Sequence, residues 1–339
     1  MSAPTNAGII GVGLSVPDRV LSNADLEKLV DTSDEWIMSR TGIRERRMCG
    51  PDETSATLGA AAARRALDDA GLAPDDLDLI ICSTATGDYI WPATACVIQA
   101  AIGAGRCPAF DLSAACSGFV YGLATAAAFV NSGQMRSILV VGVDTLTKQI
   151  NWQDRGTCIL FGDGAAATVI GPCAPNEGIL ATSMGADGTG LEQIILPAGG
   201  TKMPVTPEVI EKKLNCIQMR GAEVFKFAVK IMADACVDAL SKANLTSQDV
   251  DLFIPHQANI RIINAAAERM GLAPERVFKN VDRYGNTSAA SIGIAMREAL
   301  DQGLLRRGSV VVTVGFGAGL TWAANVIRWS RDEGGDRAA

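Results

Sequence analysis

The sequence predicts an α/β protein built from two similar halves, and three observations support this prediction. The chain has 339 residues, of which 48% are hydrophobic and 20% are charged, which is enough apolar material for a large packed core. Short runs of valine, isoleucine and leucine alternate with longer segments that suit helices, a pattern typical of mostly parallel sheets covered on both faces. A stretch near residue 66 returns near residue 239, which indicates an internal duplication.

The duplicated stretch describes a helix, a stop and a strand. Its first copy reads Ala-Leu-Asp-Asp-Ala-Gly-Leu at 66–72, and its second copy reads Ala-Leu-Ser-Lys-Ala-Asn-Leu at 239–245. Asn244 stands where the first copy has Gly71, and both residue types suit the left-handed backbone that ends a helix. Each copy leads into an apolar run, and a looser match follows later in each half. The order of the matches favours duplication over chance.

The repeat divides the chain into two halves and a tail. We expect an N-terminal half over 1–175, a C-terminal half over 176–330 and a frayed polar tail over 331–339. Glycine and proline cluster at 171–176, where the halves should join. Helices are expected to follow Thr54, Ala93 and Cys116 in the first half and to cover 222–240, 258–270 and 287–300 in the second.

The composition argues against several classes of protein. The net charge of -7 disfavours nucleic acid as the main partner, and there is no apolar run long enough to predict a membrane span. The first residues lack the basic and apolar regions of a signal peptide. The nine cysteines form no Cys-x-x-Cys pair and there is one histidine, so we expect no metal site. These features favour a reduced, cytoplasmic protein.

The single histidine, His256, lies where an apolar run gives way to polar residues, in Ile-Pro-His-Gln-Ala-Asn at 254–259. Imidazole has the side-chain pKa closest to neutral pH, so it suits proton transfer and hydrogen bonding. The alternative is a core histidine satisfied by one hydrogen bond. Ligands of open α/β sheets bind beyond the carboxyl ends of strands, and a position just after a strand therefore favours a functional role.

The first half offers Cys116 as a nucleophile. A short apolar segment ends before it, small residues flank it, and it opens an expected helix. Free N–H groups and the positive end of the helix dipole stabilise a thiolate, so we expect the pKa of Cys116 to be lowered. The alternative is one more buried cysteine. In the second half the corresponding turn contains Asn286, either as a helix cap or with its amide directed toward the same space. A glycine-rich turn at 314–320 could let a ligand approach the backbone and offer N–H groups to an oxyanion.

Several motifs then form a specific set. They are Ala-Cys-Ser-Gly at 115–118, Asp-Arg-Gly-Thr at 154–157, Phe-Gly-Asp-Gly-Ala at 161–165, Pro-His-Gln-Ala-Asn at 255–259 and Gly-Asn-Thr-Ser at 285–288. Together they resemble the β-ketoacyl-acyl carrier protein synthase III family, and the resemblance covers nearly the whole chain. It implies a thiolase-like fold, in which two pseudo-symmetric α/β halves pack as an αβαβα sandwich.

The resemblance implies that Cys116, His256 and Asn286 act together. Cys116 would attack an acyl-coenzyme A and become acylated, with backbone N–H groups of Cys116 and Ala318 holding the oxyanion. His256 and Asn286 would then hydrogen-bond the thioester of malonyl-acyl carrier protein and stabilise the enolate formed as CO2 leaves. The product would be 3-oxoacyl-carrier protein, the first condensation product of type II fatty acid synthesis. No cofactor is implied.

The resemblance also assigns substrate contacts. Coenzyme A would meet Thr32, Trp36, Arg40, Arg155, Gly156 and Asn259, with Trp36 and Arg155 enclosing the adenine. The acidic carrier protein would meet Lys226, Lys230, Arg261 and Gln257. Trp91 lies in a loop that would close the acyl pocket of the neighbouring subunit of a homodimer. Many relatives carry phenylalanine there, and the larger indole predicts a preference for short primers such as acetyl.

Other protein classes fit less well. A papain-like protease also uses Cys, His and Asn in this order, but the chain lacks the motif around its nucleophile and its disulfide pattern. A thiolase needs a second cysteine near the late glycine turn, and no cysteine follows Cys236. A binding protein without activity would be expected to lose one member of the triad. An acyltransferase or condensing enzyme of polyketide or other secondary metabolism stays open, because it would keep the same fold and triad.

Overall fold

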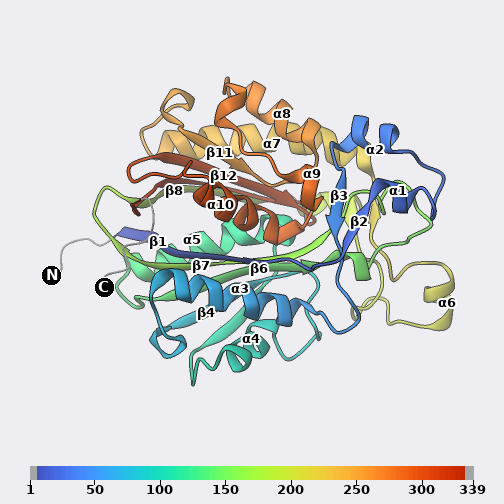
Figure 1. Cartoon of the computed structure of the whole chain (residues 1–339), viewed down its shortest axis with the longest axis horizontal. Helices are drawn as coiled ribbons and strands as arrows, with labels where there is room; N and C mark the ends of the chain where they lie inside the picture. Colours follow the sequence, from blue (N-terminus) through green and yellow to red (C-terminus); the bar gives the residue numbers. More distant parts are fainter. Residues whose placement is uncertain (1–5, 333–339) are drawn as a thin grey trace.

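The computed structural model describes residues 6–332, and two sheets form its centre (Figure 1). The first sheet has the strand order β1-β7-β6-β4-β5 and the second has the order β11-β12-β13-β8. The first sheet comprises β1 (Asn6–Ser15), β4 (Leu79–Ser83), β5 (Ala109–Leu112), β6 (Ile138–Thr145) and β7 (Asp163–Cys173). The second comprises β8 (Gly178–Ala186), β11 (Leu252–Pro255), β12 (Val310–Gly317) and β13 (Thr321–Arg328).

Helices cover both sheets and fill the space between them. The layer between the sheets holds α5 (Gly118–Asn131) and α10 (Ser291–Asp301), each of which contacts strands of both sheets. The outer layers are α3 (Ser55–Ala70) with α4 (Thr94–Ile102) on one side, and α7 (Gly221–Lys242) with α8 (Ile260–Arg269) on the other (Figure 1). The predicted αβαβα sandwich is therefore confirmed. Its layers bury apolar side chains on both faces of each sheet.

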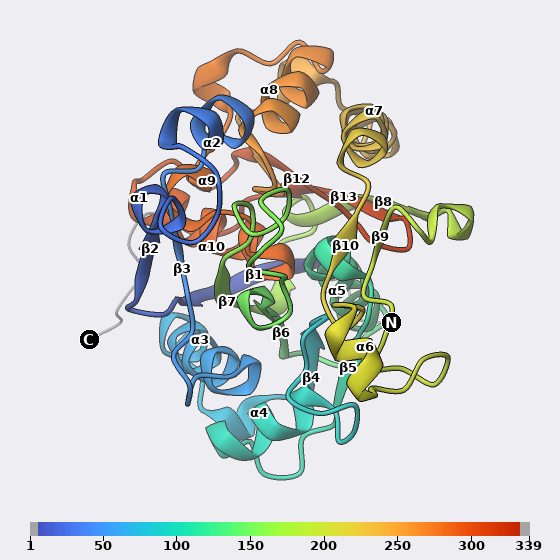
Figure 2. The same cartoon turned by 90° about the vertical axis from the view of Figure 1, so that its right-hand side faces the viewer.

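Short elements gather at one end of the sandwich, which faces the viewer in Figure 2. The helices there are α1 (Asn23–Leu26), α2 (Asp34–Thr41), α6 (Pro207–Glu211) and α9 (Val281–Tyr284). The strands there pair as β2 (Val20–Ser22) with β3 (Glu45–Arg47) and as β9 (Ile194–Ile195) with β10 (Gln218–Met219). No helix within residues 6–332 is long and apolar enough to cross a membrane.

The two sheets repeat one plan. Strands β1-β7-β6-β4 and β8-β13-β12-β11 follow the same spatial order, and in both sets the first two pairs are antiparallel and the last is parallel. Only β5 has no counterpart among the described strands. The duplicated stretches correspond as expected, because Gly71, directly after α3, has φ +67° and Asn244, two residues after the end of α7, has φ +56°. The expected join at 171–176 covers the end of β7 and the turn before β8.

The prediction of mostly parallel sheets was wrong, since both sheets are mixed. The chain turns directly from β12 into β13, at the expected glycine-rich turn, and pairs with itself antiparallel. Strand β7 likewise runs antiparallel to both of its neighbours. These strands are buried on both faces, and a continuous apolar run carries no information about strand direction.

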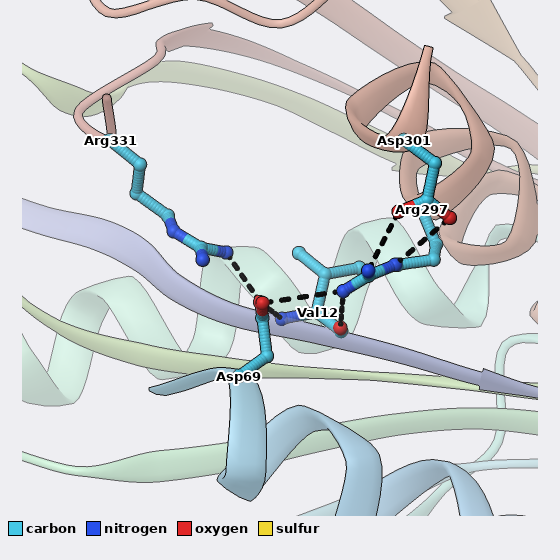
Figure 3. Close-up of polar contacts among 5 residues, drawn as sticks. All are labelled: Val12, Asp69, Arg297, Asp301 and Arg331. Carbon is cyan, nitrogen blue, oxygen red and sulfur yellow. Dashed lines mark hydrogen bonds and ion pairs between the residues drawn. The ribbon is translucent and has the colours of Figure 1, made fainter. Parts of the chain in front are cut away.

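A charged cluster ties the halves together (Figure 3). Asp69 on α3 accepts hydrogen bonds from the backbone N–H of Val12 (2.8 Å) and from Arg331 (2.6 Å). Arg297 on α10 contacts Asp69 at 3.3 Å, donates to the carbonyl of Val12 and pairs with Asp301. Arg331 was expected in a frayed tail, but this ion pair anchors it and leaves its side chain 12% exposed. The tail residues 333–339 lie outside the described residues.

Candidate active site

A cavity of about 790 Å³ lies between α2, α7, α8 and the segment at 154–161. Cys116, His256 and Asn286 all line it, although they are far apart in the sequence. The pseudo-symmetric plan explains their meeting, because His256 directly follows β11, whereas Cys116 and Asn286 come from corresponding turns that precede α5 and α10. The structure thus brings the three predicted residues to one place.

Glycines in β12 let the Cys116 turn pack directly on the second sheet. A Cβ on Gly317 would lie 2.6 Å from the backbone nitrogen of Cys116, and one on Gly315 would lie 3.0 Å from its carbonyl oxygen. Any side chain at either position would push the turn away. Both glycines belong to strand β12. The sequence led us to expect that a ligand would approach the backbone here, but at Gly315 and Gly317 it is the Cys116 turn that lies against the strand.

Burial raises the pKa of the Cys116 thiol to about 12. A hydrogen bond from Ser288 Oγ to Cys116 Sγ (3.2 Å) lowers this pKa, whereas the negative charge of Asp144 raises it further. The expected lowering of this pKa was wrong. Cys116 lies in a 3-10 turn, and α5 begins two residues later at Gly118. The protein atoms packed around this partly exposed cysteine, which the sequence does not reveal, outweigh the nearby helix end in this shift.

His256 is 1% exposed, and burial lowers the pKa of its imidazole to about 3. The ring is therefore neutral and carries one N–H. Its Nδ1 lies 2.6 Å from Ser291 Oγ, which also accepts a hydrogen bond from the backbone N–H of Gln257 (3.3 Å). The Ser291 hydroxyl can accept from Gln257 and donate to Nδ1 at the same time, and we assign its proton to the bond with Nδ1. This arrangement leaves Nε2 as the N–H donor of the ring.

Asn286 is fixed by its backbone and by its own side chain. Its N–H donates to the carbonyl of Leu160 (2.8 Å), and its carbonyl accepts from Gly162 (3.0 Å). The side-chain Oδ1 accepts from the N–H of Ser288 at 2.9 Å. Since Oδ1 is engaged, the NH2 of the side-chain amide is the group that Asn286 can offer to a ligand. His256 and Asn286 can thus both act as hydrogen-bond donors in the cavity.

The residues expected at coenzyme A mostly line the same cavity. Trp36, Arg40, Arg155, Gly156 and Asn259 do so, whereas Thr32 lies outside the lining. The guanidinium carbons of Arg40 and Arg155 lie 4.6 Å and 5.1 Å from the centroid of the Trp36 ring. Asn259 caps α8 and donates to the carbonyl of Arg40 (2.9 Å). An adenine stacked on Trp36 must therefore displace one of the two guanidinium groups.

The residues expected at the carrier protein divide into two groups. Lys226 and Arg261 are exposed and line the cavity, and Lys230 is exposed one helical turn further along α7. Gln257 is 1% exposed, and its side chain bonds the carbonyls of Pro255 and Phe278 and the N–H of Asn280. The structure gives Gln257 this bracing role in place of the predicted contact, because no polar atom of its side chain is left to meet a partner.

The family-model comparison identifies two parts of the chain. Residues 110–188 match the 3-oxoacyl-[acyl-carrier-protein] synthase III model, and residues 240–329 match the C-terminal model of the same family. The β-ketoacyl-[acyl-carrier-protein] synthase III of Caldanaerobacter subterraneus subsp. tengcongensis is 54% identical over 96% of this chain and 98% of that protein. This chain belongs to the 3-oxoacyl-[acyl-carrier-protein] synthase III family. It is an acyltransferase of the condensing type.

Solved structures agree with this assignment. The 3-oxoacyl-[acyl-carrier-protein] synthase III of Aquifex aeolicus VF5 is 45% identical, with a TM-score of 0.88 over 96% of this chain and 100% of that one. The priming β-ketosynthase of the R1128 polyketide pathway is 36% identical, also with a TM-score of 0.88, over 98% of this chain and 99% of that one. The predicted family and fold are both confirmed.

Two further predicted residues of the synthase, Trp91 and Ala318, lie outside the cavity lining. Trp91 is 83% exposed, beside the equally exposed Ile90 and near Tyr89. It therefore does not line the cavity of its own chain. Ala318 follows Gly317, which does line the cavity, and the Ala318 carbonyl accepts from Thr321 Oγ1 (3.1 Å). Within residues 6–332 no group of three or more His, Cys, Asp or Glu side chains could hold a metal.

Sequence reasoning missed three polar residues around the synthase triad. Ser291 contacts His256, Ser288 contacts Cys116, and Asp144 is buried nearby at the end of β6. Ser288 ends the Gly-Asn-Thr-Ser motif at 285–288, but serine is common in turns and its presence there does not indicate a contact with the nucleophile. Asp144 interrupts the apolar segment Leu-Val-Val-Gly-Val-Asp, and a lone carboxylate in a buried strand was the available signal.

Proposed function

We propose that this synthase catalyses the initiating condensation of type II fatty acid synthesis. It joins a short acyl group from acyl-coenzyme A to malonyl-acyl carrier protein and releases CO2 and coenzyme A. The observation that supports this proposal is the meeting of a cysteine, a neutral histidine and an asparagine on one cavity that also reaches Trp36. A thiol supplies the nucleophile, and the other two supply hydrogen-bond donors.

In the first step Cys116 Sγ attacks the acyl thioester. The carbonyl oxygen gains negative charge in the tetrahedral intermediate, and the backbone N–H groups of Cys116 and Ala318 are proposed to stabilise it. The close packing of the Cys116 turn on β12 fixes the nucleophile beside that strand. Coenzyme A then leaves, and the acyl group stays on Cys116.

In the second step malonyl-carrier protein places its thioester carbonyl against His256 Nε2–H and the side-chain amide of Asn286. These donors stabilise the enolate that forms as CO2 departs. The enolate carbon attacks the acyl-cysteine, and Cys116 leaves. Loss of CO2 creates the carbanion directly, so the step needs no carboxylate base, no second histidine and no cofactor.

Two sets of cations are proposed to receive the substrates. Trp36 and Arg155 hold the adenine of coenzyme A between them once Arg155 has moved from the ring, with Thr32, Arg40, Gly156 and Asn259 nearby. Lys226, Lys230 and Arg261 attract the acidic carrier protein, and all three are exposed beside or near the cavity. Electrostatic attraction of this kind speeds encounter.

The loop carrying Trp91 supports a proposed homodimer. Tyr89, Ile90 and Trp91 are 61%, 84% and 83% exposed, an apolar group that a second copy of the chain would cover. In that dimer Trp91 closes the acyl pocket of the partner and limits it to short primers. The nine cysteines are all free, which fits a reduced cytoplasmic setting.

A second candidate is priming of polyketide or other secondary metabolism. The 36% identity to the R1128 priming β-ketosynthase supports this second candidate, since that enzyme has the same architecture. The two candidates differ in the primer and in the carrier protein that they accept, and the geometry of the triad serves both equally well.

A primer panel tests the proposal. The synthase is given acetyl-, isobutyryl- or octanoyl-coenzyme A with malonyl-carrier protein from fatty acid synthesis, and the products are identified by mass. We expect acetyl-coenzyme A to react fastest with the unaltered enzyme. In the Trp91→Ala variant, the ratio of the acetyl rate to the octanoyl rate should be smaller. Replacing the exposed Leu29 by alanine serves as the matched control and should change nothing. Faster use of octanoyl by the unaltered enzyme would refute the short-primer assignment, and failure to condense any primer would refute the function.

A further inference from the structure

Malonyl decarboxylation in the proposed mechanism needs two hydrogen-bond donors at one oxygen. They are Nε2–H of His256 and the side-chain NH2 of Asn286, and each must lie about 3 Å from the enolate oxygen. The two residues come from separate segments, since His256 follows β11 whereas Asn286 follows α9. The structure therefore has to fix the distance between these segments, and the side chain of Gln257 bonds to both of them.

Gln257 joins the end of β11 to the start of α9 through its side-chain amide. The side chain is 1% exposed. Its Nε2 donates to the carbonyls of Pro255 (2.8 Å) and Phe278 (3.2 Å). Its Oε1 accepts from the backbone N–H of Asn280 (3.0 Å). Pro255 directly precedes His256, and Asn280 directly precedes α9, so one buried amide holds both segments by their backbones.

Helix α10 contacts the same two segments. Its Ser291 hydrogen-bonds His256 Nδ1 (2.6 Å). Its Glu298 accepts from Asn280 Nδ2 (2.8 Å), before α9, and from the hydroxyl of Tyr284 (2.7 Å), at the end of α9. Ser291 and Glu298 are about two helical turns apart and therefore lie on one face of α10. The helix thus serves as a common base for the segments that carry the two donors.

These contacts form a closed frame, in which Gln257 supplies the direct link between the two segments. We propose that Gln257 is a positioning residue for malonyl decarboxylation and sets the distance between His256 Nε2 and the amide of Asn286. It acts through these donors and does not touch the substrate. Without its amide, the end of β11 and the start of α9 can shift relative to each other. This inference rests on the proposed function, because it concerns the donors of that same step.

Acylation does not depend on this frame in the same way, because the Cys116 turn packs on two glycines of β12. A shift of about 1 Å between His256 and Asn286 should cost about 100-fold in decarboxylation. A Gln257 that only fills the core makes a different prediction, since a loss of stability lowers acylation and decarboxylation together. The ratio of the two half-reactions therefore separates the two roles.

The experiment replaces Gln257 by methionine, which has a similar length but lacks the amide. The full chain is assayed for labelling by radioactive acetyl-coenzyme A and, separately, for release of CO2 from malonyl-carrier protein at several concentrations. For Gln257→Met we expect kcat for CO2 release to fall by about 100-fold. Its KM for malonyl-carrier protein and its rate of acylation should stay close to those of the wild type.

Asn325→Leu is the matched control, because it also removes a buried side-chain amide. Asn325 is 0% exposed on β13, donates to the carbonyl of Val120 (3.2 Å) and accepts from Thr182 Oγ1 (2.7 Å). This variant should lose stability, which its melting temperature measures. It should keep the wild-type ratio of decarboxylation to acylation, because Asn325 lies outside the frame.

Glu298→Gln tests the frame at a second point. A neutral amide has one acceptor oxygen and cannot replace the carboxylate, which receives hydrogen bonds from Asn280, Arg283 and Tyr284. We expect a selective loss of CO2 release in this variant too. In the double variant with Gln257→Met, the loss should be smaller than the product of the two single losses, because both changes open the same frame.

An unchanged ratio of decarboxylation to acylation in Gln257→Met would overturn the proposal, whether both rates fall together or neither falls. If Gln257→Met does not fold, the same ratio in Glu298→Gln decides. The unaltered enzyme separates this inference from the proposed function. Its failure to be labelled or to release CO2 would contradict the proposed function, whereas an unchanged ratio in the variants of an active enzyme contradicts the positioning role alone.

Discussion

His256 can donate a hydrogen bond in a protonation state that stays the same around neutral pH. Burial removes the ring from water and disfavours its charged form, and the bond with Ser291 leaves the proton on Nε2. A charged imidazolium would attract a growing enolate more strongly. The neutral ring avoids the larger cost of burying a cation between the sheets, and Asn286 supplies a second donor.

The first prediction concerns the pH dependence of this residue. Because the pKa of His256 is lowered to about 3, the ring stays neutral from about pH 5 to pH 8. Decarboxylation of malonyl-carrier protein by a Cys116→Ala variant, which lacks the titrating thiol, should therefore be flat across this range. The measurement is the release of labelled CO2. An inflection near the ordinary histidine pKa of about 6.5 would contradict the assignment.

Strand β12 positions the nucleophile through two of its glycines, Gly315 and Gly317. The strand lies against the Cys116 turn, with no room for a Cβ at Gly315 or Gly317. The second prediction belongs to this element. Gly317→Ala places a methyl group 2.6 Å from the Cys116 nitrogen, so the turn must move. A displacement of about 1 Å at a reacting atom costs about 100-fold in rate.

Acylation by radioactive acetyl-coenzyme A measures this effect, and Gly200→Ala is the control, since a Cβ at Gly200 would meet nothing within 4 Å. We expect the rate to fall by about 100-fold in Gly317→Ala and to stay unchanged in Gly200→Ala. Equal rates in the two variants would show that the close contact between β12 and the Cys116 turn has no part in catalysis.

Residue types at particular positions in the sequence predicted several helix ends and the three residues of the triad. The helix ends at Gly71 and Asn244 could be predicted because few residue types adopt the left-handed backbone that ends a helix. The three triad residues could be predicted because each lies at the end of a strand or near the start of a helix. Such signals depend on neighbours in the sequence. The duplication then brought the strand ends together.

Properties set by distant neighbours could not be read in the same way. The pKa of Cys116 depends on the protein atoms that pack around it, and their effect is opposite to the expected lowering. Gln257 lies next to His256 in the sequence, yet the carbonyl of Phe278 and the N–H of Asn280 draw its side chain inward. Strand directions were misread for a related reason, because both faces of β7 and β12 are buried.

At the scale of the whole molecule, the Asp69 cluster in Figure 3 joins α3 of the first half to α10 of the second half and to Arg331, which follows β13. Burial alone would raise the pKa of Asp69. Hydrogen bonds from Arg331 and Val12, together with the charges of Arg331 and Arg297, lower it below its usual value. A folded-state pKa below the unfolded value means that the cluster stabilises the protein at neutral pH and loses this effect in acid.

The third prediction follows from this sign. At pH 7, Asp69→Asn should lower the free energy of unfolding by about 1.5–3 kcal/mol, the usual contribution of hydrogen bonds to a charged group. The difference should shrink as the pH falls below about 4, where the unfolded-state carboxyl becomes protonated. Urea unfolding at both pH values measures it. Asp332→Ala is the control, because its pair with Arg307 is 48–60% exposed and should contribute less than about 1 kcal/mol. If the difference in unfolding free energy between the wild type and Asp69→Asn grew as the pH fell, the stabilising role of the Asp69 cluster at neutral pH would be contradicted.

The half-reactions test the central claim, which is that Cys116 carries the acyl group while His256 acts on malonyl-carrier protein. Each variant is assayed for labelling by radioactive acetyl-coenzyme A and, separately, for release of CO2 from malonyl-carrier protein. We predict that Cys116→Ala is not labelled, and that His256→Ala is labelled but releases almost no CO2. Equal condensation rates in the wild type and His256→Ala would contradict the account.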